Sequence, residues 1–231
     1  MKRPYVICHM APSIDGRIVT GRWGMQRALT REYEGTAATL DGDAWIIGRI
    51  SMEPYAGKAA LPRAKKREPI PREDFIARDD APSYAIAIDP SGKLRWESNA
   101  IDEEHVITIL NEGVSDDYLA FLQGKQVSYL FGGKQDIDLP MVLEKLARNF
   151  GIKRLLLEGG GKINGTFLAA DLIDELSILV APVADGAIGT PALFDTEDDA
   201  PARSLKLISV EQRRNDIVWL RYKVKRGASK G

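Results

Sequence analysis

The segment with the clearest chemical potential is a run of three glycines between an apolar stretch and a helical one. It reads Leu155-Leu156-Leu157-Glu158-Gly159-Gly160-Gly161-Lys162-Ile163-Asn164. Glycines let the backbone approach a ligand closely, and the amides at a helix start carry partial positive charge. A tight strand-to-helix turn without a ligand is the alternative interpretation. Because three consecutive glycines exceed the needs of a turn, the segment favours pyrophosphate binding.

The spacing of these glycines differs from the two common nucleotide-binding motifs. No Gly-Lys-Ser/Thr stands at the spacing of a P-loop, and the usual dinucleotide fingerprint has spaced glycines after the first strand. A second pair, Gly132-Gly133, follows the apolar run 127–131. If the strands before the two turns are parallel neighbours, both turns lie at the carboxyl edge of the sheet. Ligands bind at that edge in open α/β sheets.

Three other polar segments are candidates for binding. Asp15-Gly16 follows the first apolar run and predicts a turn. Ser51 enters a helix after Ile46-Ile47-Gly48, where a hydroxyl binds a phosphate or caps the helix, and capping is the favoured interpretation. The Pro-rich and charged stretch 58–80 predicts a surface excursion. Its basic cluster Lys65-Lys66-Arg67 is interpreted as solvated, with contact to a substrate phosphate as the alternative.

Composition and charge narrow the class of protein. The formal net charge is -1, which argues against nucleic acid as the main partner. No stretch approaches the roughly 20 apolar residues that span a bilayer, and the N-terminus does not resemble a signal peptide. A single cysteine, Cys8, points to a reducing cytoplasm. We expect no metal site, because neither His9 nor His105 stands at metal-ligand spacing from other ligands.

Short apolar runs alternate with helical segments through most of the chain. The predicted strands cover 5–10, 44–47, 84–88, 105–110, 127–131, 154–158 and 176–181. The predicted helices run from Thr30 as N-cap to about Leu40, over 116–123 between Ser115 and Gly124, from Asp138 to Gly151, and from about Ile163 to Ala170. This alternation indicates a largely parallel sheet with helices on both faces.

The end of the chain has a different pattern, with two strands around a polar turn. Residues 205–210 and 217–224 flank the turn 213–216, and apolar residues of the second strand alternate with Arg221, Lys223 and Lys225. This predicts an antiparallel hairpin with one solvated face. We therefore expect one α/β domain over residues 1–226, followed by a frayed tail over 227–231.

Taken together, these motifs resemble one known family. Ser-Ile-Asp-Gly at 13–16, Ile-Ile-Gly-x-x-Ser at 46–51 and Leu-Glu-Gly-Gly-Gly-x-x-Asn at 157–164 are similar to the reductase domain of riboflavin biosynthesis, the RibD C-terminal domain. The similarity continues through Phe167-Leu168, 172–176 and Ala181-Pro182 to Gly186. It implies the dihydrofolate reductase-like fold: one domain with a mostly parallel central sheet, helices on both faces and an antiparallel C-terminal hairpin. The zinc deaminase domain of fused members has no counterpart in these residues.

The resemblance implies a reaction and a cofactor. The chain resembles the family's 5-amino-6-(5-phosphoribosylamino)uracil reductases, which reduce the ribosyl side chain of this phosphorylated aminopyrimidine to ribityl, using NADPH. The implied contacts of the cofactor are the glycine turns and the helix start, namely Gly132, Gly133, Gly159, Gly160, Gly161, Lys162, Ile163 and Asn164. Ser51 stands where the family has a threonine that contacts the cofactor. Ser91, Lys93 and Arg95 resemble a family segment near the 2′-phosphate and would select NADPH over NADH; a charged surface turn is the alternative.

The resemblance also implies the residues that lie beside the substrate. Glu158 would face the substrate, Asp15 would lie near the nicotinamide and the substrate, and Thr20 would contact the substrate. Asp15 and Glu158 are the ionisable candidates for a catalytic proton donor, and water is the alternative. The demand on the protein is small, because the cofactor carries the hydride.

The chain departs from the family pattern after Ser51. Members that act on the riboflavin precursor usually carry Asp-Asp-Pro shortly after the threonine. The segment here is Ser51-Met52-Glu53-Pro54-Tyr55, which lacks the acidic pair. The basic residue that holds the substrate phosphate has no clear counterpart either, and Arg63, Lys65 and Arg67 are the stand-ins.

Two other functions stay open at this point. One is a dihydrofolate reductase-like enzyme that acts on a different heterocyclic or carbonyl substrate. The other is a nucleotide-binding module without turnover. The family is commonly dimeric, so we expect a homodimer in which the hairpin strand 217–224 supplies part of the interface. We expect no nucleic acid or membrane partner.

Overall fold

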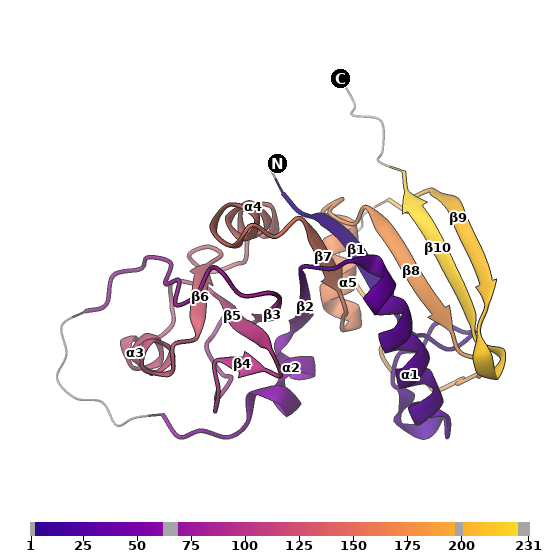
Figure 1. The fold of residues 1–231 in the computed structure, drawn as a ribbon, viewed down its shortest axis with the longest axis horizontal. Helices are drawn as coiled ribbons and strands as arrows, with labels where there is room; N and C mark the ends of the chain where they lie inside the picture. Colours follow the sequence, from indigo (N-terminus) through magenta and orange to yellow (C-terminus); the bar gives the residue numbers. More distant parts are fainter. Residues whose placement is uncertain (1–2, 62–68, 197–200, 226–231) are drawn as a thin grey trace. The chain divides into compact units, whose positions relative to one another are not determined.

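The computed structural model describes residues 3–61, 69–196 and 201–225 (Figure 1). The chain divides into two compact units, which are described separately. The first unit comprises Met1–Pro4 and Asp43–Leu155, and the second comprises Tyr5–Gly42 and Leu156–Gly231. The expected single domain over 1–226 stays a prediction. Arg63, the cluster Lys65-Lys66-Arg67 and the tail 227–231 lie outside the described residues.

The first unit is built on parallel strands. β2 (Ala44–Gly48) pairs with β3 (Tyr84–Ile88), which pairs with β5 (Glu104–Leu110), and β5 pairs with β6 (Ser128–Phe131). The short β4 (Ala100–Ile101) is antiparallel to the start of β5. β3 is buried along its whole length. Such uniform burial is expected of parallel strands with both faces covered, and it confirms the interpretation of these apolar runs.

Three helices accompany these strands, and their ends follow capping rules in two cases. They are α2 (Arg49–Ala56), α3 (Asp116–Lys125) and α4 (Leu139–Phe150). The side chains of Ser115 and Asp138 accept from the amides of Tyr118 and Met141, which confirms both predicted N-caps. The predicted end at Gly124 is wrong, because α3 runs to Lys125 and the left-handed residue is Gln126. Trp96, Tyr118 and Tyr129 are the largest side chains of the buried core.

The second unit contains four neighbouring strands (Figure 1). β1 (Tyr5–Met10) is parallel to β8 (Glu175–Val180); β8 is antiparallel to β10 (Val218–Val224), which is antiparallel to β9 (Leu205–Gln212). This confirms the predicted C-terminal hairpin. β7 (Arg154–Leu157) begins in the first unit and ends in the second. The mixed α/β class with a mostly parallel sheet is therefore confirmed.

The helices of the second unit begin earlier than the sequence patterns predict. α1 covers Gln26–Ala37 and continues as the 3-10 turn η2 (Ala38–Leu40), so Thr30 lies inside the helix and its predicted cap is wrong. α5 covers Gly161–Ala169, two residues ahead of the expected start at Ile163. Two further 3-10 turns are η1 (Thr20–Arg22) and η3 (Arg214–Asp216). No helix in the described part of the chain has the length and apolarity needed to cross a membrane.

A chain of buried hydrogen bonds links β1, β8, β10 and α1. His9 Nε2 lies 3.2 Å from the carbonyl oxygen of Tyr33, which only accepts, so this nitrogen carries the hydrogen. His9 Nδ1 then accepts from the Ser177 hydroxyl at 2.9 Å, and Ser177 Oγ accepts from Trp219 Nε1 at 2.8 Å. The hydrogen bonds among His9, Tyr33, Ser177 and Trp219 can all form only while His9 is neutral, because a protonated Nδ1 could not accept from Ser177. Burial therefore lowers the pKa of His9 from 6.5 to about 4.

This arrangement predicts a pH dependence of stability. In the unfolded chain His9 takes up a proton near pH 6.5, whereas in the folded chain it does so only near pH 4. The free energy of unfolding therefore has its full value above pH 6.5 and decreases as the pH falls toward 4. The loss reaches about 3 kcal/mol across this window. Urea unfolding between pH 7.5 and 4.5 measures it, and His9→Gln lowers stability at pH 7.5 but flattens the pH slope. Equal slopes for the variant and the wild type would contradict the assignment.

Candidate functional site

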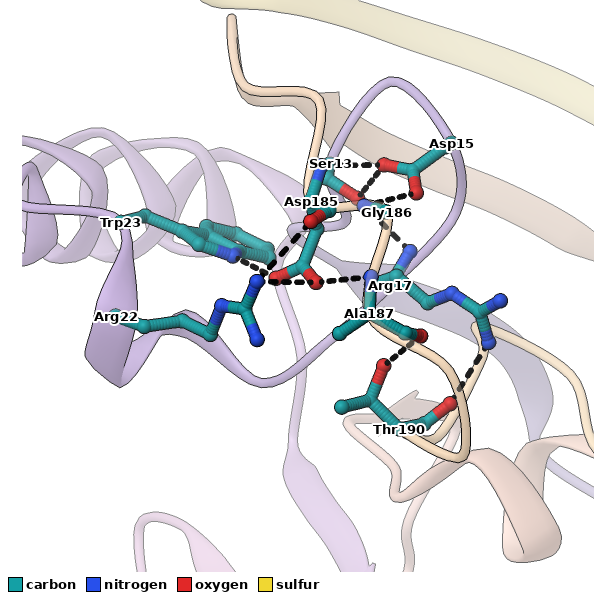
Figure 2. Close-up of polar contacts among 9 residues, drawn as sticks. All are labelled: Ser13, Asp15, Arg17, Arg22, Trp23, Asp185, Gly186, Ala187 and Thr190. Carbon is teal, nitrogen blue, oxygen red and sulfur yellow. Dashed lines mark hydrogen bonds and ion pairs between the residues drawn. The ribbon is translucent and has the colours of Figure 1, made fainter.

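The first group of candidate residues surrounds Asp15 in the second unit (Figure 2). The Asp15 carboxylate accepts from the Ser13 hydroxyl at 2.7 Å and from the backbone amides of Asp185 and Gly186 at 2.9 Å each. These donors hold the pKa of Asp15 well below its usual range, the Asp185 amide contributing most. Asp15 is therefore ionised at neutral pH and clamps the segment after β8 to the turn after β1. An ionised carboxylate has no proton to donate, so the geometry favours a positioning task for this side chain.

Asp185 extends the same cluster toward the start of α1. Its carboxylate accepts from Trp23 Nε1 at 2.5 Å and from the Ala187 amide at 3.0 Å, and it pairs with Arg22 at 3.4 Å (Figure 2). The indole donor is the largest cause of the lowered pKa of Asp185. Two neighbouring carboxylates thus stay charged because each is surrounded by donors. Asp185 was not among the predicted site residues, because the signal for it is a long-range pairing with Trp23.

The remaining predicted substrate residues, Thr20 and Glu158, lie between Asp15 and Asp185 in the chain. Thr20 begins η1, and its carbonyl accepts from the amide of Trp23 at 3.0 Å. Glu158 follows β7 directly and is half-buried. The charge of Glu158 adds to burial in raising the pKa of the Cys8 thiol, so Cys8 stays protonated and is no nucleophile. The tasks assigned to Thr20 and Glu158 stay predictions.

Contacts within the protein explain why two residues at and after the glycine turn that follows β7 are glycines. A Cβ on Gly161 would lie 2.2 Å from the carbonyl oxygen of Ala192, and one on Gly165 would lie 2.2 Å from that of Asp195. The amide of Asp195 also donates to the carbonyl of Gly161 at 3.0 Å. Glycine is therefore needed here because the segment 192–196 lies directly against α5. Gly159 is required for another reason, its positive φ of 99°.

Hydrogen-bonding capacity nevertheless remains at the start of α5. Gly160 is the N-cap, and no side chain caps the helix. Asn164 is fully buried, and its Nδ2 donates to the Leu193 carbonyl at 3.0 Å, while its Oδ1 has no partner among the described residues. A buried acceptor without a donor is costly, so a bound water or ligand is expected to supply one. Uncapped amides next to this acceptor are suited to a ligand that presents both an anion and an N–H group.

The second glycine pair belongs to the first unit, where β6 pairs with β5 rather than with β7. The condition that would place the two glycine turns side by side is therefore not met. A Cβ on Gly133 would lie 2.3 Å from the carbonyl oxygen of Asp136, and one on Gly132 would meet Ile137 at 2.9 Å. These contacts with the segment before α4 account for both glycines. Binding of a cofactor by Gly132 and Gly133 stays a prediction.

The segment after β3 forms a rigid turn around a buried carboxylate. Asp89 Oδ2 accepts from the amides of Lys93 and Leu94 at 2.7 and 2.8 Å and from the Tyr118 hydroxyl at 3.3 Å. Burial raises the pKa of Asp89, and its Oδ1 has no partner among the described residues. Gly92 has a φ of 63° and lies so close to Tyr118 that a Cβ would be 2.5 Å from the ring. The turn is therefore held in one conformation.

This turn presents the side chains that were predicted to contact a 2′-phosphate. Arg95 donates to the carbonyls of Gly92 and Leu94 at 3.1 Å each, and its guanidinium lies 5.6 Å above the Tyr118 ring. Ser91 and Lys93 are exposed on the same turn. A guanidinium fixed by its own backbone and an aromatic ring loses little entropy when it pairs with an anion.

Ser51 is the third residue of α2, whose N-cap is Gly48. The interpretation of Ser51 as a helix cap is therefore wrong, because a cap residue precedes the helix. Its side chain is exposed and makes no hydrogen bond with the residues that the structure describes. The missing acidic pair has a local explanation: Met52 is fully buried in the core of the first unit, and Glu53 forms an ion pair with Arg49.

Comparison with known proteins gives a consistent result. Residues 4–219 match the family model described as the RibD C-terminal domain. The 2,5-diamino-6-ribosylamino-4(3H)-pyrimidinone 5′-phosphate reductase of Methanothermobacter thermautotrophicus is 28% identical over 211 residues, which cover 89% of this chain and 90% of the relative. The reductase of the same name from Aquifex aeolicus is 23% identical, and the alignment covers 85% of each chain.

Solved structures show the same fold. A pyrimidine reductase-like protein from Corynebacterium diphtheriae superposes with a TM-score of 0.66 at 19% identity, covering 97% of this chain and 93% of that one. The riboflavin biosynthesis reductase Rib7 of Saccharomyces cerevisiae gives a TM-score of 0.61 at 17% identity, covering 97% and 91% of the two chains. The predicted fold and the predicted family resemblance are both confirmed.

The Asp15 clamp leads to a prediction about local stability. Removal of the carboxylate in Asp15→Ala leaves the amides of Asp185 and Gly186 without their acceptors, so their hydrogen exchange accelerates by roughly tenfold or more. Hydrogen–deuterium exchange of the peptide over 183–190 measures this. Ile14→Ala is the matched control, because the Ile14 side chain lies in the same turn and is 69% exposed. Wild-type exchange in Asp15→Ala would show that the clamp is unimportant.

Proposed function

Because the chain belongs to the RibD C-terminal domain family, we propose that it is an NADPH-dependent reductase of a phosphorylated ribosylaminopyrimidine. The observation that carries this proposal is the match over residues 4–219 together with nearly full-length coverage of reductases of this kind. The proposed substrate is 2,5-diamino-6-ribosylamino-4(3H)-pyrimidinone 5′-phosphate, the compound in the names of these relatives. The deaminated uracil analogue is the second candidate, because one structural relative, from Thermotoga maritima, is named as a combined deaminase and reductase of this compound.

The residues around α5 fit the pyrophosphate and carboxamide of a nicotinamide cofactor. The uncapped start of α5 at Gly161, Lys162 and Ile163 offers amides to an anion. The unpartnered Oδ1 of buried Asn164 offers an acceptor to an N–H group such as a carboxamide. Both features are unused by the described residues, which supports the proposed binding of this segment to a cofactor.

The turn after β3 fits the phosphate that distinguishes NADPH from NADH. Arg95 is already oriented by the Gly92 carbonyl and the Tyr118 ring, and Ser91 and Lys93 add a hydroxyl and an ammonium on the same turn. A guanidinium binds a phosphate through two parallel hydrogen bonds. The proposed selection of NADPH therefore depends on a positive charge that the fold holds in place before the cofactor arrives.

The cofactor supplies a hydride when bound. The chain therefore has to bind the cofactor and the substrate, orient them, and provide a proton to the substrate. Asp15 does not supply the proton, because its donors keep the carboxylate ionised. We assign it the task of holding the segment 183–190 in the conformation that receives the substrate. Glu158 is the remaining ionisable candidate beside the substrate, and its place at the end of β7 suits that task. Water stays the alternative proton source.

The reductase activity has a direct test. The protein with NADPH and the diamino substrate is expected to lose absorbance at the reduced-nicotinamide band and to form the ribityl product, detected by mass spectrometry. The uracil analogue is assayed in parallel, and the faster reaction identifies the substrate. The absence of turnover with both compounds would contradict the proposal. In that case, a rise in melting temperature with NADPH alone would indicate the nucleotide-binding module.

Cofactor selection is tested at Arg95. Arg95→Ala is expected to raise the KM for NADPH by about tenfold or more, because one charge-assisted contact with the 2′-phosphate is lost. The KM for NADH is expected to stay unchanged. Arg78→Ala is the matched control, since Arg78 pairs with Asp80 in the same unit and outside the turn. An equal change for both cofactors would contradict this assignment.

We also propose that the protein forms a homodimer through β9. Leu205, Leu207, Ile208 and Val210 of this strand are 39 to 55% exposed, and apolar side chains that gather on an edge strand commonly mark an interface. The strand predicted to supply part of the interface, 217–224, corresponds to the adjoining β10. Light scattering measures the mass, and a monomer would contradict the proposal.

A cytoplasmic location stays a prediction.

A further inference from the structure

The second unit carries a cluster of charged side chains to which the preceding sections assign no task. It lies where the first half of α1 faces the turn between β9 and β10. Two adjoining hollows of about 420 and 440 Å³ share Arg31, Glu32 and Arg214 as lining residues. Arg213 is the further charged residue that lines the first hollow, and Arg27 is the further charged residue that lines the second. The two hollows together are called the arginine groove.

The groove has an excess of positive charge within itself. Glu32 is its acidic lining residue, and Arg213 forms ion pairs with Glu32 at 3.1 Å and with Glu211 of β9 at 3.4 Å. Arg213 is held further by a cation–π contact 5.7 Å from the Trp219 ring centre. The side chains of Arg27, Arg31 and Arg214 are exposed and make no ion pair or hydrogen bond with another described residue. Three guanidinium groups therefore surround the groove without a counter-charge from the described chain.

The placement of these charges is unfavourable for α1 itself. Arg27 and Arg31 stand four residues apart on one helix face, where like charges repel. Arg27 also lies in the first turn, which has no acidic residue, and the N-cap Met25 provides no side-chain cap. The whole chain has a net charge of -1, so this cluster does not reflect a general excess of positive charge. Departures from local rules concentrate at functional sites.

We propose that the arginine groove binds a phosphate-bearing small molecule. A phosphate or diphosphate group supplies the missing negative charge to Arg27, Arg31 and Arg214, and the guanidinium fork matches phosphate oxygens. Each hollow exceeds 400 Å³, within the range of small-molecule sites. The paired Arg213 and Glu32 form the fixed wall of the groove, because their charges are already satisfied.

The phosphate has two conceivable sources. Trp23, whose indole donates to Asp185, directly precedes Gly24 of the groove, and the turn after β9 leads to Val218, which pairs with Val180 at the end of β8. The segment that lines the groove therefore directly follows a residue that contacts the Asp15–Asp185 cluster, and the 5′-phosphate of the substrate is one source. That assignment rests on the proposed function. A separate phosphorylated metabolite is the other source, and binding of such a ligand does not depend on turnover.

Calorimetric titration with inorganic pyrophosphate at constant ionic strength tests the binding itself. The double variant Arg31→Gln/Arg214→Gln is expected to bind pyrophosphate at least tenfold more weakly than the wild type. Lys206→Gln/Lys223→Gln is the matched control, because it removes two cationic side chains from the same unit without touching the groove. All four side chains are exposed, and melting temperatures check that each variant folds. Wild-type binding by the arginine variant, or equal losses in both variants, would overturn the proposal.

Kinetics with the same variants distinguish the two sources. If the substrate phosphate occupies the groove, the arginine variant raises the KM for the phosphorylated pyrimidine at least tenfold and leaves the KM for its dephosphorylated nucleoside unchanged. If a separate metabolite binds, pyrophosphate affinity falls while both KM values stay at the wild-type level. Failure of turnover in the wild type contradicts only the proposed function, because the calorimetric result stands independently of it.

Discussion

The Asp15 carboxylate is the interaction on which the second unit's site depends. It lies in the turn after β1, and its acceptors are filled by Ser13 and by the amides of Asp185 and Gly186 in the segment after β8. β1 and β8 are parallel neighbours, so their carboxyl ends emerge at the same edge. Beyond those ends the two segments stay joined by the parallel bridge between Ser13 and Ala181 and by the Ile14 amide, which donates to the Val183 carbonyl at 2.9 Å. The Asp15 carboxylate extends this link to Asp185 and Gly186, and it accepts their amides best while it stays ionised.

The glycine-rich turn after β7 serves packing and binding at once. Gly161 and Gly165 admit the backbone of 192–196, a purely internal requirement. That contact orders Asn164 through the Leu193 carbonyl, and Asn164 Oδ1 stays buried without a partner among the described residues. The close packing therefore leaves a buried acceptor to which the proposed ligand would donate a hydrogen bond. The number of glycines alone overstates the evidence for a ligand, because packing against the backbone of 192–196 already requires two of them.

Much of the fold could be predicted because its signals are local. Apolar runs such as 84–88 and caps such as Ser115 and Asp138 are decided by neighbouring residues, and both features are found. The start of α1 was misplaced because Met25 caps it without a side-chain signal. Asp185 and the arginine groove escaped prediction for another reason. Their partners are about 162 to 181 residues away in the chain, and no local pattern shows that Arg213 meets Glu32.

The two candidate anion sites, the turn with Arg95 and the arginine groove, differ in how their positive charges are held. Arg95 is a single guanidinium whose orientation is fixed by its own backbone and by Tyr118, and whose turn is held by buried Asp89. In the arginine groove, guanidinium groups that have no partner among the described residues surround Arg213, which is held by ion pairs with Glu32 and Glu211. A fixed charge discriminates between ligands that differ by one phosphate, because its geometry cannot adapt. Several movable charges attract any phosphate, and they require the rest of the ligand to provide the specificity.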